Sequence, residues 1–235
     1  MTQLSLLSRQ PPEQLPLALR ADPAPTRDEA IEGPECEAAL RLVDAWPHWP
    51  SHAALLFGPS GSGKSFTAAL WARHASASRI AGSELSELNP QRYGGRAVLI
   101  EHVDIALRGE RPRATQTGLF HLLNTLRESG GHVLMTSRTP LEGLALSVRD
   151  LTSRLKAAAH VQLHAPGSAH MEAVLFKLFA DRQLALDLAA LSLIRERIPR
   201  SLSVARQVVD RVDRLALAEQ RRVTRAMVMR ALRAV

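Results

Sequence analysis

The chain has 235 residues, of which 46% are hydrophobic, so it can bury one substantial core as a single domain or as a domain with a small partner. Its single cysteine, Cys36, excludes an internal disulfide and a cysteine-rich metal site. The sequence shows neither a leader peptide nor an apolar run of about 18 residues, so we expect a cytoplasmic protein without a membrane partner.

The formal net charge of +7 is concentrated near the C-terminus. Between Arg195 and Val235 there are eleven arginines and no lysine against four acidic residues, and the rest of the chain is balanced. A basic segment of this kind can contact nucleic acid or an acidic protein face. It can equally be a solvated helical face, because arginine is a good helix former, and the sequence leaves both interpretations open.

The N-terminal segment 1–27 contains five prolines and little periodicity, which predicts a flexible tail. Within it, Gln14-Leu15-Pro16-Leu17-Ala18-Leu19 has the form of a short linear peptide that docks into an apolar groove. Leucine-rich tails also produce such strings by chance, so the peptide alone is weak evidence.

Short apolar runs then alternate with segments of helical spacing. The runs, which predict buried strands, are 53–57, 97–100, 132–135 and 161–163, and the helical segments are 35–46, 67–75, 119–126 and 147–158. This alternation predicts an α/β fold with a parallel sheet flanked by helices. Past Pro166-Gly167 only helical periods remain, at 169–183, 188–197, 202–220 and 225–234. The expected organisation is a tail (1–27), an α/β core (28–165) and an all-helical lid subdomain (166–235).

The stretch after the first apolar run fits the pattern G-x-x-x-x-G-K-[ST] at every fixed position. Its residues are Gly58, Pro59, Ser60, Gly61, Ser62, Gly63, Lys64 and Ser65. The glycines let backbone N–H groups curl around phosphate oxygens, and the following helix N-terminus adds partial positive charge. Lys64 would reach the β- and γ-phosphates, and Ser65 would bind Mg²⁺. The pattern predicts that the chain binds a nucleoside triphosphate or diphosphate.

Two strand ends carry candidate catalytic groups. Glu101 follows the second run, in the place where an acidic residue normally holds Mg²⁺. The next residue, where an acid that activates water is common, is His102, and an acid returns only at Asp104. We therefore expect weak intrinsic hydrolysis, although either of these two residues could substitute. Thr136 or Ser137, after the third run, could contact the γ-phosphate or the attacking water, or could simply cap the strand end.

Two arginines are candidates for contacts with phosphate. Arg154 follows a helical segment and precedes the last strand, and in oligomeric NTPases an arginine in this place projects into a neighbour's site. By spacing alone, an ordinary surface arginine is the simpler interpretation. Arg200, which follows Pro199 in the lid, could reach the phosphates of the chain's own nucleotide or belong to the basic face.

The chain resembles the AAA+ ATPases of the bacterial replication initiator DnaA in the order of its motifs. These motifs are the phosphate loop, the acidic strand end, Thr136–Pro140, Asp150–Leu155 and a lid arginine. The resemblance covers roughly residues 35–235. DnaA has a further helix-turn-helix domain, whereas we expect this chain to end at the lid. With the tail peptide in front of such a core, the chain looks like the Hda-type regulatory inactivators of DnaA.

The resemblance implies a negative regulator of replication initiation with defined residue roles. The residues that would bind the β sliding clamp are Gln14, Leu15, Leu17 and Leu19. Arg154 would be the arginine finger that stimulates ATP hydrolysis by DnaA in trans, and Arg200 would be the second sensor of the lid. The implied cofactors are ADP or ATP and Mg²⁺, with Ser65 and Glu101 as metal residues and Thr136 beside the nucleotide.

The implied partners are the DnaA initiator and the clamp. DNA would be reached indirectly through the clamp, near the nucleoid or replisome, and the chain could form homo-oligomers. The alternative is a AAA+ helicase loader or DNA-handling ATPase of the DnaA clade, which hydrolyses ATP itself and meets DNA through its arginine-rich lid. His102 argues against that alternative, which also gives the tail peptide no role.

Overall fold

The computed structural model describes residues 25–185 and 188–233, so the predicted clamp peptide lies outside the described residues. A five-stranded sheet forms the centre of the fold, with strand order β2-β3-β4-β1-β5 and every neighbouring pair parallel. The strands are β1 (Ala53–Phe57), β2 (Ser78–Ile80), β3 (Ala97–Ile100), β4 (His132–Ser137) and β5 (Ala159–Gln162). Because both faces of the inner strands are covered, these strands are almost continuously apolar.

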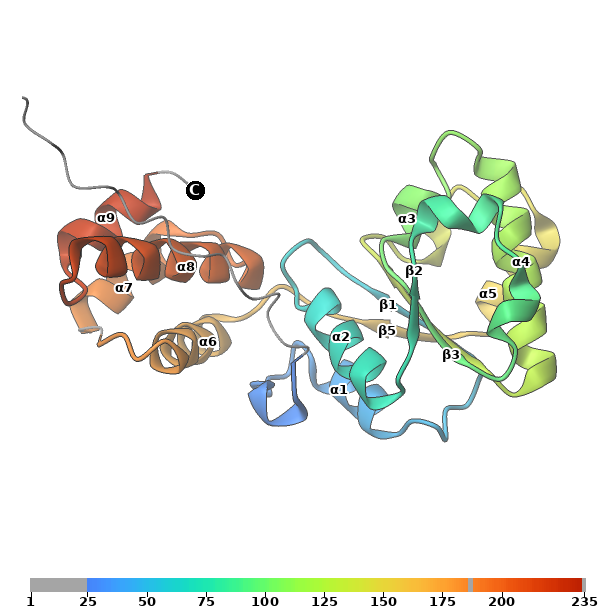
Figure 1. The fold of residues 1–235 in the computed structure, drawn as a ribbon, viewed down its shortest axis with the longest axis horizontal. Coiled ribbons are helices and arrows are strands. Elements are labelled where there is room, and N and C mark those ends of the chain that lie inside the picture. Colours follow the sequence, from blue (N-terminus) through green and yellow to red (C-terminus); the bar gives the residue numbers. More distant parts are fainter. Residues whose placement is uncertain (1–24, 186–187, 234–235) are drawn as a thin grey trace, which may run out of the picture.

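Helices cover both faces of the sheet (Figure 1). One layer contains α1 (Glu37–Asp44) and α2 (Lys64–His74), and the other contains α3 (Val103–Ala106), α4 (Pro112–Ser129) and α5 (Arg149–Lys156). Successive residues of β3 point to opposite layers: Val98 and Ile100 pack with α4, whereas Leu99 packs with α2. The short 3₁₀ helices are Arg27–Glu29, Gly82–Ser86, Pro90–Tyr93 and Leu141–Gly143.

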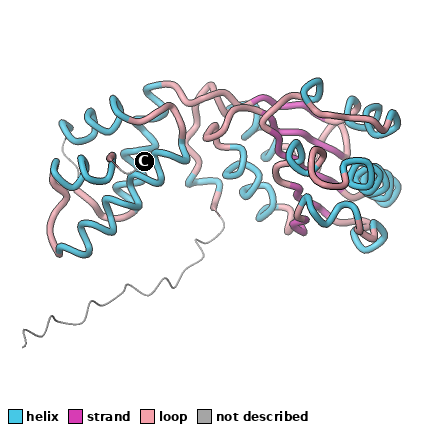
Figure 2. Tube along the Cα trace, turned by 90° about the horizontal axis from the view of Figure 1, so that it is seen from above, coloured by secondary structure: helices cyan, strands magenta, loops and turns pink. Residues whose placement is uncertain are grey.

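The chain continues after β5 into a helical lid with its own core. Its helices are α6 (Ser168–Asp181), α7 (Leu188–Arg197), α8 (Leu202–Glu219) and α9 (Arg225–Leu232). Buried side chains such as Leu175, Ile194 and Val209 form this third core, separate from the two on the sheet. Among the described residues beyond β5 there is no strand, and Figure 2 shows only helices and the loops that connect them at that end of the molecule. The α/β fold with helices after it is confirmed.

Most predicted elements are present, with shifted ends. Of the run 161–163, the first two residues belong to β5, which begins at Ala159 and ends at Gln162. The helix predicted at 119–126 is the centre of α4. Strand β2 was not predicted, because this edge strand pairs only with β3 and buries only Ile80 fully. Among the described residues, we find no helical stretch with the length and apolarity that a bilayer crossing requires.

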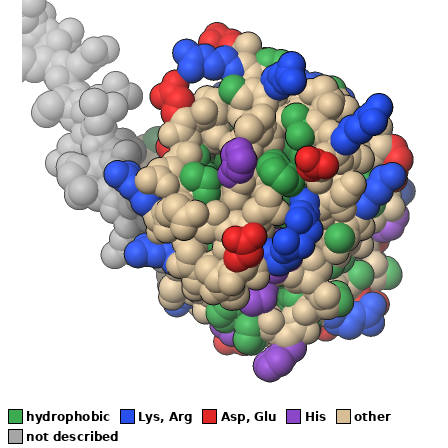
Figure 3. Space-filling view, turned by 90° about the vertical axis from the view of Figure 1, so that its right-hand side faces the viewer, with side chains coloured by type: hydrophobic (Ala, Val, Ile, Leu, Met, Phe, Trp, Pro, Cys, Tyr) green, Lys and Arg blue, Asp and Glu red, His purple; other side chains and the backbone are tan. Residues whose placement is uncertain are grey.

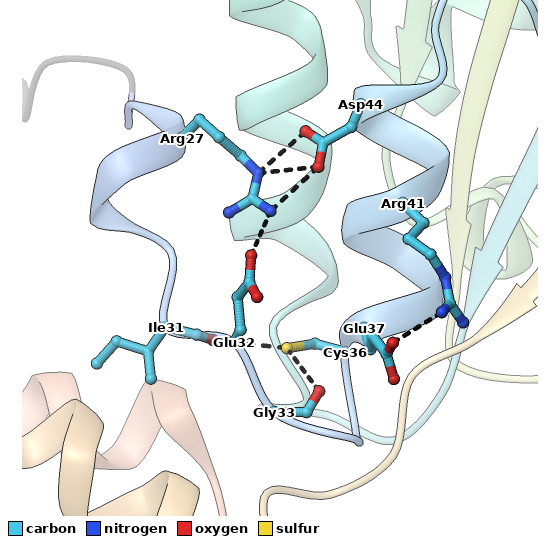
Figure 4. Close-up of polar contacts among 8 residues, drawn as sticks. All are labelled: Arg27, Ile31, Glu32, Gly33, Cys36, Glu37, Arg41 and Asp44. Carbon is cyan, nitrogen blue, oxygen red and sulfur yellow. Dashed lines mark hydrogen bonds and ion pairs between the residues drawn. The ribbon is translucent and has the colours of Figure 1, made fainter.

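The segment before α1 is held by an ion-pair network (Figure 4). Arg27 Nε donates to Asp44 Oδ1 at 3.0 Å, and its Nη2 donates to Glu32 Oε1 at 2.6 Å. The Cys36 thiol donates to the carbonyls of Ile31 and Gly33, and burial raises the pKa of this thiol. Cys36 is therefore an unreactive packing residue rather than a nucleophile.

Glu35 connects the core to the lid. One of its carboxylate oxygens accepts from the backbone N–H of Gly167 at 2.7 Å, and the other lies 3.3 Å from Nδ1 of the buried His170 on α6. The pKa of Glu35 is lowered, chiefly by a hydrogen bond from its own backbone N–H. Burial opposes this effect, and the hydrogen bond from Gly167 lowers the pKa further. The ionised carboxylate therefore stabilises the junction between the two parts.

Glu35→Gln is expected to lower the melting temperature near pH 7 by several degrees, since hydrogen bonds to a charged group contribute about 1.5–3 kcal/mol. Because the folded-state pKa of Glu35 is lowered, this stabilisation is present above the unfolded pKa of about 4.3 and is lost as the pH falls through the folded pKa. Melting curves at a series of pH values should show the two proteins converging in acid. A difference that stays constant down to about pH 3 would contradict this role.

Candidate functional site

The loop between β1 and α2 has the backbone shape that its glycines predict. Gly58, Gly61 and Gly63 all have positive φ angles, of 151°, 75° and 98°. A Cβ atom at Gly58 would lie 2.1 Å from the carbonyl oxygen of Leu163, and one at Gly61 would lie 1.9 Å from Ser201 Oγ. The loop is therefore a tight cradle at the carboxyl edge of the sheet, enclosed by the end of β5 and the start of α8. Such a cradle, leading into a helix N-terminus, suits a phosphate group.

Lys64 lies inside this loop and is buried, with 6% of its surface exposed. Its Nζ donates to the carbonyl oxygens of Gly58 at 2.8 Å and Pro59 at 2.7 Å. Burial lowers the pKa of Lys64, and Asp104 opposes this shift. An ammonium that bonds to loop carbonyls can exchange them for phosphate oxygens, which are stronger partners for a cation.

The predicted metal residues, Ser65 and Glu101, do not hydrogen-bond to each other. Ser65 is exposed on the first turn of α2, whereas the carboxylate of Glu101 lies 3.5 Å from Arg79 Nη1. Glu101 and His102 line a cavity of about 780 Å³ together with Arg79, and no residue of the phosphate loop lines it. Among the described residues, no group of three or more His, Cys, Asp or Glu side chains could hold a metal by itself. The metal assignment of Glu101 stays a prediction.

Both hydroxyls at the end of β4 bond to the chain itself. Thr136 is completely buried, and its Oγ1 accepts from the backbone N–H of His102 at 2.9 Å. Ser137 Oγ donates to the carbonyl of Thr139 at 2.6 Å. This geometry is that of a strand-end cap, so the placement of Thr136 beside a nucleotide stays a prediction.

Arg138 is a candidate site residue that was not predicted from the sequence. Arg138 directly follows β4 at the carboxyl edge, is exposed, and is one of the charges that lower the pKa of Lys64. Its positive charge therefore adds to that of Lys64 near the loop. Its position immediately after the Thr136-Ser137 pair was the available signal.

The predicted lid arginine lies next to the phosphate loop. Leu202 donates its backbone N–H to the carbonyl of Gly61 at 2.8 Å, and Ser201 caps α8 through the N–H of Val204. Arg200 immediately precedes this contact and is exposed. The structure thus places Arg200 two residues before a backbone contact with the loop, and its contact with the chain's own nucleotide stays a prediction.

Arg154 lies at the opposite edge of the sheet. It is in the last turn of α5, shortly before β5 begins. His52 is the residue before β1; burial is the main cause that lowers its pKa, and the charge of Arg154 lowers it further. A strand of five residues separates that edge from the loop by about 16 Å. Arg154 is half-buried, and its guanidinium forms no ion pair or hydrogen bond with another described residue. The geometry excludes a direct contact with the chain's own phosphate loop.

Compared by sequence, the chain matches no protein-family model and no curated protein. Compared by structure, it is similar to domain III of the replication initiation protein DnaA from Thermotoga maritima, with a TM-score of 0.75 and 18% identity over 88% of this chain and 95% of that chain. AMPPCP-bound DnaA from Aquifex aeolicus gives a TM-score of 0.63 and 15% identity over 89% and 90% of the two chains. RuvB from Thermotoga maritima gives a TM-score of 0.64 and 15% identity over 85% of this chain and 68% of that chain. Identities this low establish the fold alone: an α/β AAA+ core followed by a helical lid.

Proposed function

We propose that this chain is a nucleotide-binding negative regulator of replication initiation, of the Hda type, which stimulates ATP hydrolysis by DnaA. Two findings support a role beside the initiator: the fold is shared with domain III of DnaA, and the order of motifs resembles that family. Because the two proteins have the same fold, they can pack as neighbouring AAA+ domains do, with one chain facing the nucleotide of the other.

The position of Arg154 carries this proposal. Its guanidinium is without an ion-pair partner among the described residues, and it lies at the sheet edge away from the chain's own loop. An arginine in this position can neutralise phosphate charge only in another subunit, which is the action of an arginine finger in trans. The chemistry then occurs in the initiator's site.

The chain's own nucleotide has a structural role in this proposal. DnaA from Aquifex aeolicus has been solved with AMPPCP and the FIGL-1 AAA domain with ADP, which supports ADP or ATP as the ligand of Gly58–Ser65. Mg²⁺, held by Ser65 and a carboxylate near the end of β3, would neutralise phosphate charge. Arg200 would contact the same phosphates from the lid, so that the nucleotide fixes the lid against the core.

The direct test combines the protein with clamp-loaded DNA and ATP-bound DnaA and measures phosphate release. We expect hydrolysis by DnaA to rise only when the protein and the loaded clamp are both present. If phosphate release is the same with and without the protein, the proposed function is wrong, whatever nucleotide the protein itself binds.

The tail peptide should be needed for clamp binding. Gln14→Ala with Leu17→Ala removes the glutamine and one apolar anchor, and a buried leucine contributes about 1.5–3 kcal/mol, so affinity should fall by at least about tenfold. The measurement is co-elution with purified clamp, followed by titration.

The chain offers a matched control for this variant. Gln3-Leu4-Ser5-Leu6 repeats the same spacing of glutamine and leucines, so Gln3→Ala with Leu6→Ala makes the same chemical change elsewhere in the tail. We expect this control to bind clamp normally. If the control loses clamp binding and the first variant keeps it, the clamp-binding peptide is residues 3–6 instead of 14–17.

A DNA-handling ATPase is the second candidate, because α8, α9 and the turn between them expose many cations. The exposed arginines are Arg206, Arg214, Arg221, Arg222, Arg225 and Arg230. On the end of the core farthest from the lid, basic side chains are scattered among acidic ones (Figure 3). Tight DNA binding without clamp, falling steeply with salt, would favour this candidate over the first.

A further inference from the structure

We propose that Asp104, rather than Glu101, is the carboxylate that holds the hydrated Mg²⁺ of the nucleotide site. This inference rests on the nucleotide-binding part of the proposed function and not on the action in trans. It assigns a role to a residue that lies outside the usual position for a metal-binding acid in this kind of site.

Asp104 is buried and incompletely satisfied. Only 6% of its surface is exposed, and its Oδ1 has no hydrogen-bond partner among the described residues. An ionised carboxylate that is removed from water without a partner is strongly unfavourable, and buried polar atoms are almost always hydrogen-bonded. The unpartnered oxygen therefore indicates a position for a ligand that donates or carries positive charge.

The fold places this oxygen at the phosphate loop. Asp104 lies on α3, which follows β3 at the carboxyl edge and packs against β4, the strand between β3 and β1. Asp104 and Lys64 also interact electrostatically: Asp104 acts to raise the pKa of Lys64, although burial is the larger effect and the pKa is lowered. Both side chains are buried, with 6% exposed. The loop is joined to the same strand, because the backbone N–H of Gly58 donates to the carbonyl of Ser137 at the end of β4, at 3.2 Å.

Glu101 is less suited to this task. Its carboxylate already has a cationic partner in Arg79, at 3.5 Å, and its side chain is 28% exposed. It lines the cavity beside β2, which no residue of the phosphate loop lines. To hold a metal beside Ser65, Glu101 would have to leave Arg79, whereas Asp104 has a carboxylate oxygen without a partner.

The chemistry of Mg²⁺ fits this arrangement. The ion keeps several of its waters and is held by one or two carboxylates together with phosphate oxygens, so no large cluster of acids is required. The described residues contain no such cluster. Ser65 can supply a hydroxyl, the nucleotide supplies phosphate oxygens, and Asp104 Oδ1 can accept a hydrogen bond from a water of the ion.

The test compares Asp104→Asn with Glu101→Gln in full-length protein. A fluorescent ADP analogue is titrated in excess Mg²⁺ and in EDTA, and Glu110→Gln, an exposed acid on the same side, serves as control. We expect Asp104→Asn to lose at least about tenfold of the affinity gained with Mg²⁺, equal to about 1.4 kcal/mol, while Glu101→Gln and Glu110→Gln keep that gain. In EDTA, Asp104→Asn should bind at least as tightly as wild type, because a negative charge near the phosphates is gone.

The melting temperature without nucleotide separates a metal role from a structural one. If Oδ1 awaits a metal, Asp104→Asn should melt at or above the wild-type temperature, since an unpartnered buried charge is removed. A clear fall would show that the carboxylate supports the fold and would overturn the proposal. The proposal would also be overturned if Glu101→Gln lost the gain in affinity with Mg²⁺, or if Asp104→Asn kept it. Wild-type protein that binds the analogue in neither condition would instead disprove nucleotide binding, and this inference with it.

Discussion

Arg154→Ala is expected to abolish the stimulation of ATP hydrolysis by DnaA, lowering the stimulated rate by about 10³–10⁵-fold if the arginine acts fully as a finger in trans. Folding and nucleotide binding should be unchanged, because the guanidinium makes no ion pair with a described residue and α5 ends at the sheet edge that the length of β1, about 16 Å, separates from the loop. Phosphate release from ATP-bound DnaA on clamp-loaded DNA measures the first effect. Titration with labelled ADP measures the second.

Arg149→Ala is the matched control, since Arg149 is an exposed arginine at the start of the same helix. It removes the same charge from α5 and should retain full stimulation. If Arg154→Ala stimulates as well as wild type, the trans mechanism is wrong. If both variants lose stimulation equally, the helix contributes general positive charge rather than one positioned guanidinium.

Lys64→Ala is expected to lower nucleotide affinity by about 10²–10⁴-fold, because two charge-assisted hydrogen bonds to phosphate contribute about 3–6 kcal/mol together. The variant should still fold, since the ammonium bonds only to acceptors of its own loop, Gly58, Pro59 and Ser62. The measurement is equilibrium titration with labelled ADP, accompanied by a melting curve.

Lys177→Ala provides the control for this change. Lys177 is paired with Asp181 on the surface of α6, where such a pair contributes about 0.3–0.5 kcal/mol, so neither affinity nor stability should change much. Nucleotide affinity that survives Lys64→Ala would show that the loop is not the phosphate site. Equal losses in both variants would point to a general effect of charge.

The sequence predicted the parts of the site that depend on neighbouring residues. The cradle Gly58–Ser65 is local: its glycines, lysine and flanking strand and helix all lie within one short stretch. β1, β3 and β4 were found because inner parallel strands are continuously apolar. β2 was missed because its exposed Arg79 interrupts any such run.

The contacts of the acidic groups could not be predicted in this way. Whether Glu101 or Asp104 approaches Lys64 depends on which face each presents after the turn at His102, and on the partner that Arg79 supplies from β2. The connection of Glu35 to Gly167 and His170 likewise joins positions far apart in the chain. No local pattern contains these pairings, because they are set by the packing of whole elements.

The contact between the phosphate loop and the lid also limits which sequences the loop can accept. Gly61 occupies a position that the pattern G-x-x-x-x-G-K-[ST] leaves free, yet a Cβ there would lie 2.9 Å from the Cα of Ser201 as well as striking its side chain. In this chain the lid adds a steric reason for glycine at residue 61 to the positive φ of 75° that the loop itself imposes. A transplanted loop with the same fixed residues and a larger one at that position would therefore push α8 away, so loop and lid must be exchanged together.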